Sequence, residues 1–267
     1  MYPSDLSDPE WSIFESILIK HYPAYEGNPA AKKSRGRRMH TEMRDVVDGI
    51  LYISKTGCQW KFLPTDFPPW QTVRYHYDAF VRLKIIDIIL EKTNRDVRIK
   101  AGRNAHPSLG IIDSQSVKTI YGGENRGYDG NKKIKGRKRS IVTDILGLLL
   151  SVVVSSAQPH DTVLGPKCVD EALEKYPTLT CIATDKGYRG TTALHIKSRG
   201  LNVIVPELKE GEKVSEKRWV VERTFGWGGH HRRLSKDYEV LTKNSRSFVQ
   251  ISGIRRNLAK LTKVKIC

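Results

Sequence analysis

Residues 137–154 read RKRSIVTDILGLLLSVVV and contain the clearest strand pattern in the chain. The run from about Arg137 to Thr143 predicts one strand, and the run from Leu148 to Val154, rich in Leu and Val, predicts a buried one. Between them, Asp144 to Gly147 has the length and the glycine of a hairpin connection. This stretch therefore predicts two neighbouring antiparallel strands.

Further strands and helices surround this hairpin. An earlier apolar run, Leu109–Ile112, predicts another strand. After the hairpin the pattern predicts a helix from Asp161 or Thr162 to about Lys175, a strand at Leu179–Ala183, a helix at Thr191–Arg199, a strand at Leu201–Val205 and a late helix that carries Glu222. We therefore expect an α/β fold with a mixed five-stranded sheet and helices.

The first part of the chain has the apolar spacing of helices. Ser7-Asp8-Pro9-Glu10 has the pattern of a capping box at the start of a first helix. Thr41 is placed to cap a second helix, which Gly57 would end. Pro68-Pro69 opens a third helix, and Ile85–Leu90 continues into a fourth.

The third of these helices resembles a DNA recognition helix. Its open face carries Gln71, Thr72, Arg74, Tyr75 and His76. In a helix-turn-helix, the N-terminal residues of the second helix meet the base edges. An ordinary helical bundle with a polar outer surface is the alternative. The helical pattern leaves both interpretations open. We expect an all-α domain over 1–95, a polar linker over 96–107 and an α/β domain over 108–267.

The charge of the chain favours a polyanionic partner. Its net charge is +17, from 46 Lys and Arg against 29 Asp and Glu among 267 residues. Each neutralised phosphate releases counterions, so nucleic acid is the favoured partner over a solvated basic surface or an anionic membrane. The longest apolar stretch, Ile145–Val154, is too short to span a bilayer. No secretory signal is visible, and four cysteines without metal-finger spacing favour a reduced cytoplasmic protein.

Three acidic residues stand where a two-metal phosphoryl-transfer site needs carboxylates. Asp113 ends the first apolar run, Asp185 follows the strand at Leu179–Ala183, and Glu222 lies in the late helix. Hard divalent cations prefer oxygen ligands, and two such ions can hold the attacking and leaving oxygens of a phosphodiester. Simpler interpretations remain: each aspartate can cap a turn, and Glu222 can pair with Arg218 one helical turn earlier.

The sequence around these carboxylates resembles a known family. The strings IIDSQSVKT around Asp113, ATDKGYRG around Asp185 and RWVVERTFGW around Glu222 are similar to those of the DDE transposases of bacterial insertion sequences, most closely the IS5 family. LSDPEW, TGCQWKFLP, FPPWQTVRYHY and RRLSKDYEVL extend the resemblance over nearly the whole chain.

The resemblance implies a fold, a reaction and a set of partners. It implies a small all-α, helix-turn-helix-like DNA-binding domain over 1–95. It also implies an RNase H-like catalytic domain over 108–267 in which Asp113, Asp185 and Glu222 bind two Mg²⁺ ions, with Mn²⁺ as a possible substitute. The DNA partners would be the terminal inverted repeats of the element and a target duplex. A homodimer or higher homo-oligomer on DNA is expected, in the cytoplasm of a bacterium and associated with its nucleoid.

Basic residues near the predicted active site are candidates for phosphate contacts. A solvated strand edge that discourages pairing is the alternative for those around residue 135. The predicted DNA contacts are Gln71, Thr72, Arg74, Lys118, Lys132, Lys133, Lys135, Arg137, Lys138, Arg139, Arg218, Arg232, Arg233 and Lys236.

The expected mechanism has two steps at one site. Water first cuts the DNA at the element end, and the exposed 3′-hydroxyl then attacks the target, with positioning and charge neutralisation supplying the rate. Two alternatives remain open: a hydrolytic DNA nuclease of the same fold, and a domesticated DNA-binding repressor.

One departure from the family pattern follows the late glutamate. Gly228 and Gly229 stand where relatives usually have a large apolar residue and, at or next to the second position, a basic one. Glycine weakens a helix by about 0.5–1 kcal/mol relative to alanine. We therefore expect the helix to be bent or frayed here and the chain to be less active than its relatives.

Overall fold

The sheet is built from strands whose neighbouring residues face opposite layers. In the described part of the chain its strands are β1 (Leu109–Lys118), β2 (Gly127–Asp129), β3 (Ile134–Thr143), β4 (Leu149–Ser156), β5 (Cys181–Ala183) and β6 (Asn202–Ile204). Ile111 and Ile112 are both buried, yet they belong to different hydrophobic clusters, and Ile141 and Val142 divide in the same way. This period of two is what a strand between two helical layers requires.

The strand order matches the predicted α/β, RNase H-like fold. β1 and β3 are antiparallel, as are β3 and β4, whereas β5 pairs in parallel with both β1 and β6. The order β4-β3-β1-β5-β6 thus joins three antiparallel strands to two parallel ones. The short strand β2 pairs with the start of β3 and makes the sheet six-stranded rather than five-stranded.

Strand β1 is longer than its apolar run. The prediction ended at Ile112, but β1 continues to Lys118, paired with β3 as far as Gly136. The polar residues of this extension lack an alternating apolar pattern, so the sequence gave no strand signal there. Asp113 therefore lies within β1 rather than at its end.

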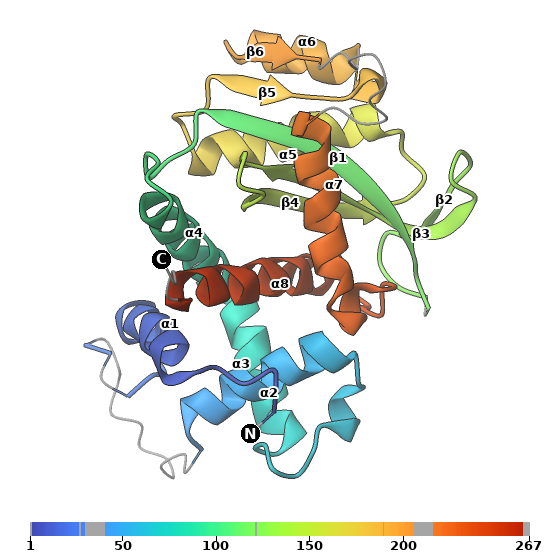
Figure 1. The fold of residues 1–267 in the computed structure, drawn as a ribbon. Coiled ribbons are helices and arrows are strands. Elements are labelled where there is room, and N and C mark those ends of the chain that lie inside the picture. The colour runs from blue at the N-terminus through green and yellow to red at the C-terminus, as the bar shows by residue number, and fades with distance from the viewer. Residues whose placement is uncertain are drawn as a thin grey trace.

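Helices cover both faces of the sheet. The helices that follow the first strands are α5 (Asp161–Lys175), α6 (Thr191–Ser198), α7 (Glu216–Gly229) and α8 (Thr242–Thr262), with 3₁₀ turns η2 (Lys186–Tyr188) and η3 (Arg232–Leu234). The α5 helix, predicted at these bounds, packs on β3 and β4 through Cys168, Val169 and Ala172. On the other face, α7 contacts β1 and α8 contacts β4 (Figure 1).

The N-terminal part is helical, as predicted. It consists of α1 (Asp8–His21), α2 (Met43–Thr56), η1 (Trp60–Phe62), α3 (Trp70–Arg82) and α4 (Ile85–Lys100). The capping box is confirmed, because the Ser7 backbone N–H donates to Glu10 Oε2 at 3.0 Å. Gly57 ends α2 with φ of +73°. The predicted cap of α2 is wrong, because the N-cap residue is Glu42 and not Thr41.

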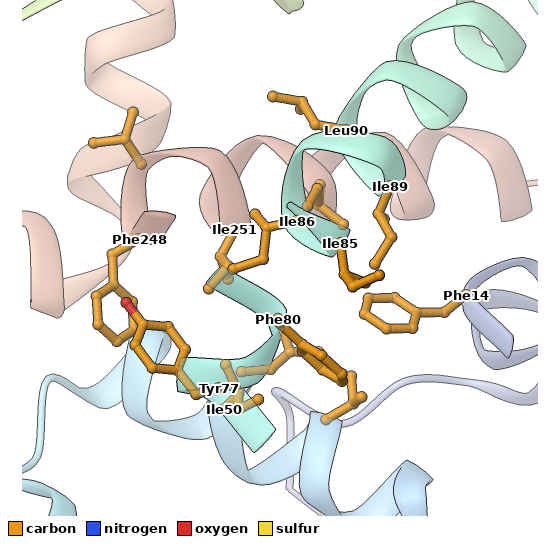
Figure 2. Packing of buried hydrophobic residues seen from close by; sticks show 14 of the residues in the cluster. Phe14, Ile50, Tyr77, Phe80, Ile85, Ile86, Ile89, Leu90, Phe248 and Ile251 are labelled. Carbon is orange, nitrogen blue, oxygen red and sulfur yellow. The ribbon is translucent and has the colours of Figure 1, made fainter. Parts of the chain in front are cut away.

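One hydrophobic core joins the N-terminal helices to the sheet. α8 packs against α1, α2 and α4 on one side and against β4 on the other (Figure 1). Figure 2 shows Ile251 and Phe248 of α8 beside Tyr77 of α3 and Ile86 of α4. Residues 96–100, predicted to belong to a linker, form the last turns of α4. The domain division at residue 95 stays a prediction.

The structure is a computed structural model that describes residues 2–26, 28–29, 41–120, 122–188, 190–205 and 216–263. Within these ranges, no helix is both long and apolar enough to cross a membrane.

Candidate functional site

Asp113 lies within β1, and Asp185 lies two residues beyond the end of β5, the strand that pairs in parallel with β1. Ile111 of β1 pairs with Ala183 of β5, and Asp113 and Asp185 each follow two residues later. Both aspartates are half-buried. The Asp113 Oδ1 atom accepts the Ser114 N–H at 2.7 Å, and the Asp185 Oδ1 atom accepts the Gly187 N–H at 2.8 Å. The predicted turn role is therefore present at Asp185, which precedes η2, but not at Asp113, which lies within a strand.

The third carboxylate comes from the helix that packs on the same strand. α7 contacts β1, and Val221 is 1% exposed in the same hydrophobic cluster as Ile111 and Ala183. Glu222, the next residue, is half-buried. The predicted pairing of Glu222 with Arg218 lies outside the described residues, because the Arg218 side chain is not among them.

The three carboxylates come from β1, from the segment after β5 and from α7, the helix that contacts β1. Among the side chains that the structure describes, no three His, Cys, Asp or Glu residues are close enough together to hold one metal ion. Their oxygen donors nevertheless suit a hard divalent cation. A shared ion would require Glu222 and the two aspartates to draw closer than they are here.

Several predicted phosphate contacts are free to meet DNA. The exposed members of the set are Lys118, Lys132, Lys133, Lys135, Arg232 and Lys236. Lys118 ends β1, and the three following lysines precede or begin β3. Exposed ammonium groups can neutralise phosphates without first breaking a bond within the protein.

Four other members of the set are buried, which corrects their prediction. Arg137, Lys138, Arg139 and Arg233 are each 7% exposed or less. Arg137 pairs with Asp237 at 3.2 Å, and Arg233 pairs with Glu239 at 2.7 Å.

The two remaining cations of this group also have protein partners. Lys138 Nζ donates to the Pro159 carbonyl at 2.7 Å, and an Arg139 N–H donates to the Leu234 carbonyl at 2.8 Å. A buried cation engaged in this way cannot reach a phosphate without losing those bonds. These residues stabilise the fold instead.

The open face of α3 is narrower than the sequence predicted. Gln71 is exposed near the start of the helix, and Thr72 is half-buried. Arg74 donates to Asp78 at 2.8 Å and lies over the Trp60 ring at 5.0 Å, so its guanidinium is already engaged. His76 is not on the open face: it is 1% exposed and bonded to a tyrosine hydroxyl.

An aromatic and cationic stack, missed from the sequence, runs along α7. Arg223 lies 4.4 Å from the ring centroid of Trp219 and 4.5 Å from that of Trp227. Arg256 and Lys260 of α8 lie 4.1 and 5.4 Å from the Trp227 centroid. The spacing of four residues between Trp219, Arg223 and Trp227 could have revealed the first half, because such residues share one helical face. The contribution of α8 could not have been found in this way.

A large cavity adjoins this stack. Its volume is about 830 Å³, and its walls come from α2, β1, β3, β4, η3, α8 and the end of α7. The described residues that line it include no Asp or Glu. The basic and histidine side chains among them are Lys55, Arg139, His230, His231, Arg255, Arg256, Lys260 and Lys263.

The glycine pair does not break α7. The helix continues through Gly228 and ends at Gly229, after which the His231 N–H donates to the Gly228 carbonyl at 2.9 Å. The helix therefore ends at the glycine pair, and the bend or fraying expected there stays a prediction. Both glycines line the cavity at the end of the helix.

We expect Gly228→Ala to raise the free energy of unfolding by about 0.5–1 kcal/mol, because alanine loses less backbone entropy in a helix. A Cβ atom at this position would meet only Leu234 Cδ1, at 3.7 Å. Gly57→Ala is the opposing control, since φ there is +73° and its Cβ would lie 3.1 Å from the Arg232 backbone. Urea denaturation should show a gain for the first and a loss for the second; a loss at Gly228 would contradict the argument.

Family models and known proteins match the chain. A model described as a putative transposase of the IS4/5 family matches residues 6–90, and a transposase DDE domain matches residues 104–251. An uncharacterized 16.2 kDa protein of insertion element IS402 from Burkholderia cepacia is 26% identical over 128 residues, covering 46% of this chain and 78% of that protein. A putative transposase for insertion sequence element IS402 from the same organism is 30% identical over 116 residues. The match covers 39% of this chain and 54% of that protein.

Solved structures resemble the chain weakly. The Mos1 mariner paired end complex with Mn gives a TM-score of 0.35 at 8% identity, covering 94% of this chain and 83% of that one. The Mos1 transposase paired-end complex with the left transposon end gives 0.36 at 10% identity, covering 86% and 78%. Likenesses at this level establish nothing about function.

Proposed function

We propose an activity for this chain from the family to which it belongs, the DDE transposases of insertion elements. The chain cuts DNA at the ends of its element and joins the 3′-hydroxyl to target DNA. The observation that supports this proposal is the parallel pairing of Ile111 with Ala183, because Asp113 and Asp185 each follow two residues after that pair. Val221 packs in the same hydrophobic cluster as Ile111 and Ala183, and Glu222 is the next residue of that helix, which supports its inclusion in the proposed site.

Asp113, Asp185 and Glu222 would hold the divalent cations, two Mg²⁺ ions in our proposal. When bound, such ions stabilise the charge on the attacking and leaving oxygens of a phosphodiester. The protein contributes the carboxylate oxygens and the fixed sheet from which two of them project. No nucleophilic side chain and no covalent protein–DNA intermediate are required.

DNA binding would be divided between two surfaces. Gln71, exposed near the start of α3, is the side chain best placed to meet a base edge. The exposed lysines Lys132, Lys133 and Lys135 would contact phosphates without regard to sequence. Since two element ends must be joined to one target, we propose that the chain acts as a dimer or higher multimer on DNA.

A strand-transfer assay with labelled element ends tests the proposal. The full chain, the duplex that borders its gene and Mg²⁺ should yield both cut ends and products joined to a second duplex. Cutting without joining would identify a hydrolytic nuclease, and binding without cutting would identify a repressor; either result would overturn the proposal. A duplex with scrambled ends is the control, and it should yield neither product.

A further inference from the structure

The stack on α7 ends in an exposed tryptophan, Trp219, which lies three residues before Glu222 on the same helix. Trp219 is 51% exposed although it is a large aromatic residue, and it stands one helical turn before Arg223. Glu222 precedes Arg223 directly. An exposed indole whose neighbour is a stacked guanidinium presents a flat apolar surface beside a positive charge.

The cations of the stack have unused hydrogen-bonding capacity. The Nε–H groups of Arg223 and Arg256 are buried and have no hydrogen-bond partner among the described residues. Arg256 donates through another N–H to the Gly147 carbonyl. Buried donors are normally bonded, so two unpartnered guanidinium N–H groups in one stack indicate a missing acceptor.

No described carboxylate of the cavity neutralises these cations. The acidic group that acts on Arg256 is Asp144, and it is itself paired with Arg98. Burial, together with the nearby Arg256, lowers the pKa of Lys260 to about 8. Arg223, Arg256 and Lys260 gather around one indole, and the nearby Asp144 is shared with Arg98, so the positive charges outnumber this counter-charge and an anionic ligand would be attracted.

We propose that the stack and the adjoining cavity bind an unpaired DNA strand. A base would stack on the open face of Trp219, and the phosphates of the strand would accept from Arg223, Arg256 and Lys260. Alternating aromatic and cationic side chains are the features that single-strand binding requires, since every base has a flat face and every nucleotide a charge. This inference rests on the proposed function: it assigns the strand next to the cut a place leading away from Glu222.

Duplex DNA does not satisfy the same surface. In a duplex the bases are stacked on one another, so an exposed indole meets a base only after a nucleotide leaves the helix. The exposed lysines near β3 serve a duplex backbone equally well without an aromatic partner. The stack should therefore discriminate between single-stranded and double-stranded DNA of one sequence.

The test measures binding without catalysis. The full chain is titrated, in the absence of divalent metal, into a labelled single strand of about 12 nucleotides and into the matching duplex. Trp219→Ala should weaken binding of the single strand by about tenfold and change binding of the duplex by less than about twofold. Trp219→Phe should restore most of the single-strand affinity, because a smaller aromatic ring remains. Arg223→Gln should also weaken single-strand binding.

Matched controls separate this effect from general loss of binding. Leu194→Ala removes an apolar side chain that is 68% exposed on α6, and Arg199→Gln removes an arginine that is paired with Asp170. Neither should change single-strand affinity. Melting temperatures of all variants establish that each is folded.

Two results would overturn the inference: single-strand affinity that is unchanged in both Trp219→Ala and Arg223→Gln, or equal losses for single strand and duplex. These results are independent of strand transfer. A parent protein that joins DNA ends yet fails the single-strand test keeps the proposed function and loses this inference. A parent protein that fails strand transfer but shows Trp219-dependent single-strand binding loses the proposed function and keeps the single-strand site.

Discussion

Asp113→Asn, Asp185→Asn and Glu222→Gln should each reduce cleavage and strand transfer by more than about a hundredfold. Each change replaces a charged oxygen ligand with a neutral amide of the same shape, so a bound cation is lost or displaced. DNA binding should remain within about twofold of the parent, because phosphate contacts elsewhere persist. Gel assays of cut and joined products, beside a binding titration in the same buffer, measure both effects.

Asp170→Asn is the matched control for this series. Asp170 is a partly exposed carboxylate on α5 that bonds to His195 at 2.9 Å and lies on a different helix from Glu222. Its loss should leave cleavage unchanged. Robust cleavage by any one of the three site variants would remove that residue from the proposed site, whereas a parallel loss of DNA binding would point to misfolding.

Arg137→Ala should lower the free energy of unfolding by about 3–5 kcal/mol, the usual cost of removing one partner of a buried ion pair. Arg137 is completely buried, and so is the side chain of its partner Asp237. The arginine also donates to the carbonyl oxygens of Glu124, Glu239 and Val240, at 2.6–2.9 Å. Truncation removes the nearer cation of Asp237, leaving Arg139 at 4.0 Å, and leaves three carbonyls without this donor.

Lys135→Ala provides the comparison for Arg137. Lys135 lies two residues earlier on β3 and is exposed, so its removal should change stability by less than about 0.5 kcal/mol. Lys135→Ala should weaken DNA binding at low salt. Arg137→Ala should affect stability rather than direct contact with DNA, because Arg137 is buried. Urea denaturation and salt-dependent titration measure the pair; an Arg137→Ala variant as stable as the parent would contradict the structural role.

The apolar strands were predictable because their signal is local. Residues 137–154 carry alternating or continuous apolar side chains, and the structure places β3 and β4 there. The extension of β1 was not predictable, since its polar residues are held by pairing with β3, which lies about 20 residues further along the chain. Long-range pairing of this kind overrides local propensity.

The motifs single out the three carboxylates, whose role as a site stays a prediction, but they do not reveal which of the neighbouring basic residues are exposed. The sequence showed six cations between Lys132 and Arg139, yet only the structure separates the exposed lysines from the buried Arg137 and Arg139. Asp237, with which the buried Arg137 forms an ion pair, lies 100 residues away in sequence. A charge run reveals that cations are present and says nothing about which of them face solvent.

The position of α8 has a consequence for folding during translation. α8 supplies Phe248, Ile251 and Ile254 to the core that also contains α1 to α4. The helices α1 to α4 are complete by residue 100, but α8 can pack against them only after residue 254 has been synthesised. Contacts between segments so distant in sequence slow folding, and uncovered apolar surface favours aggregation meanwhile. The proposed DNA-recognition surface on α3 should consequently form only after residue 254 has been synthesised.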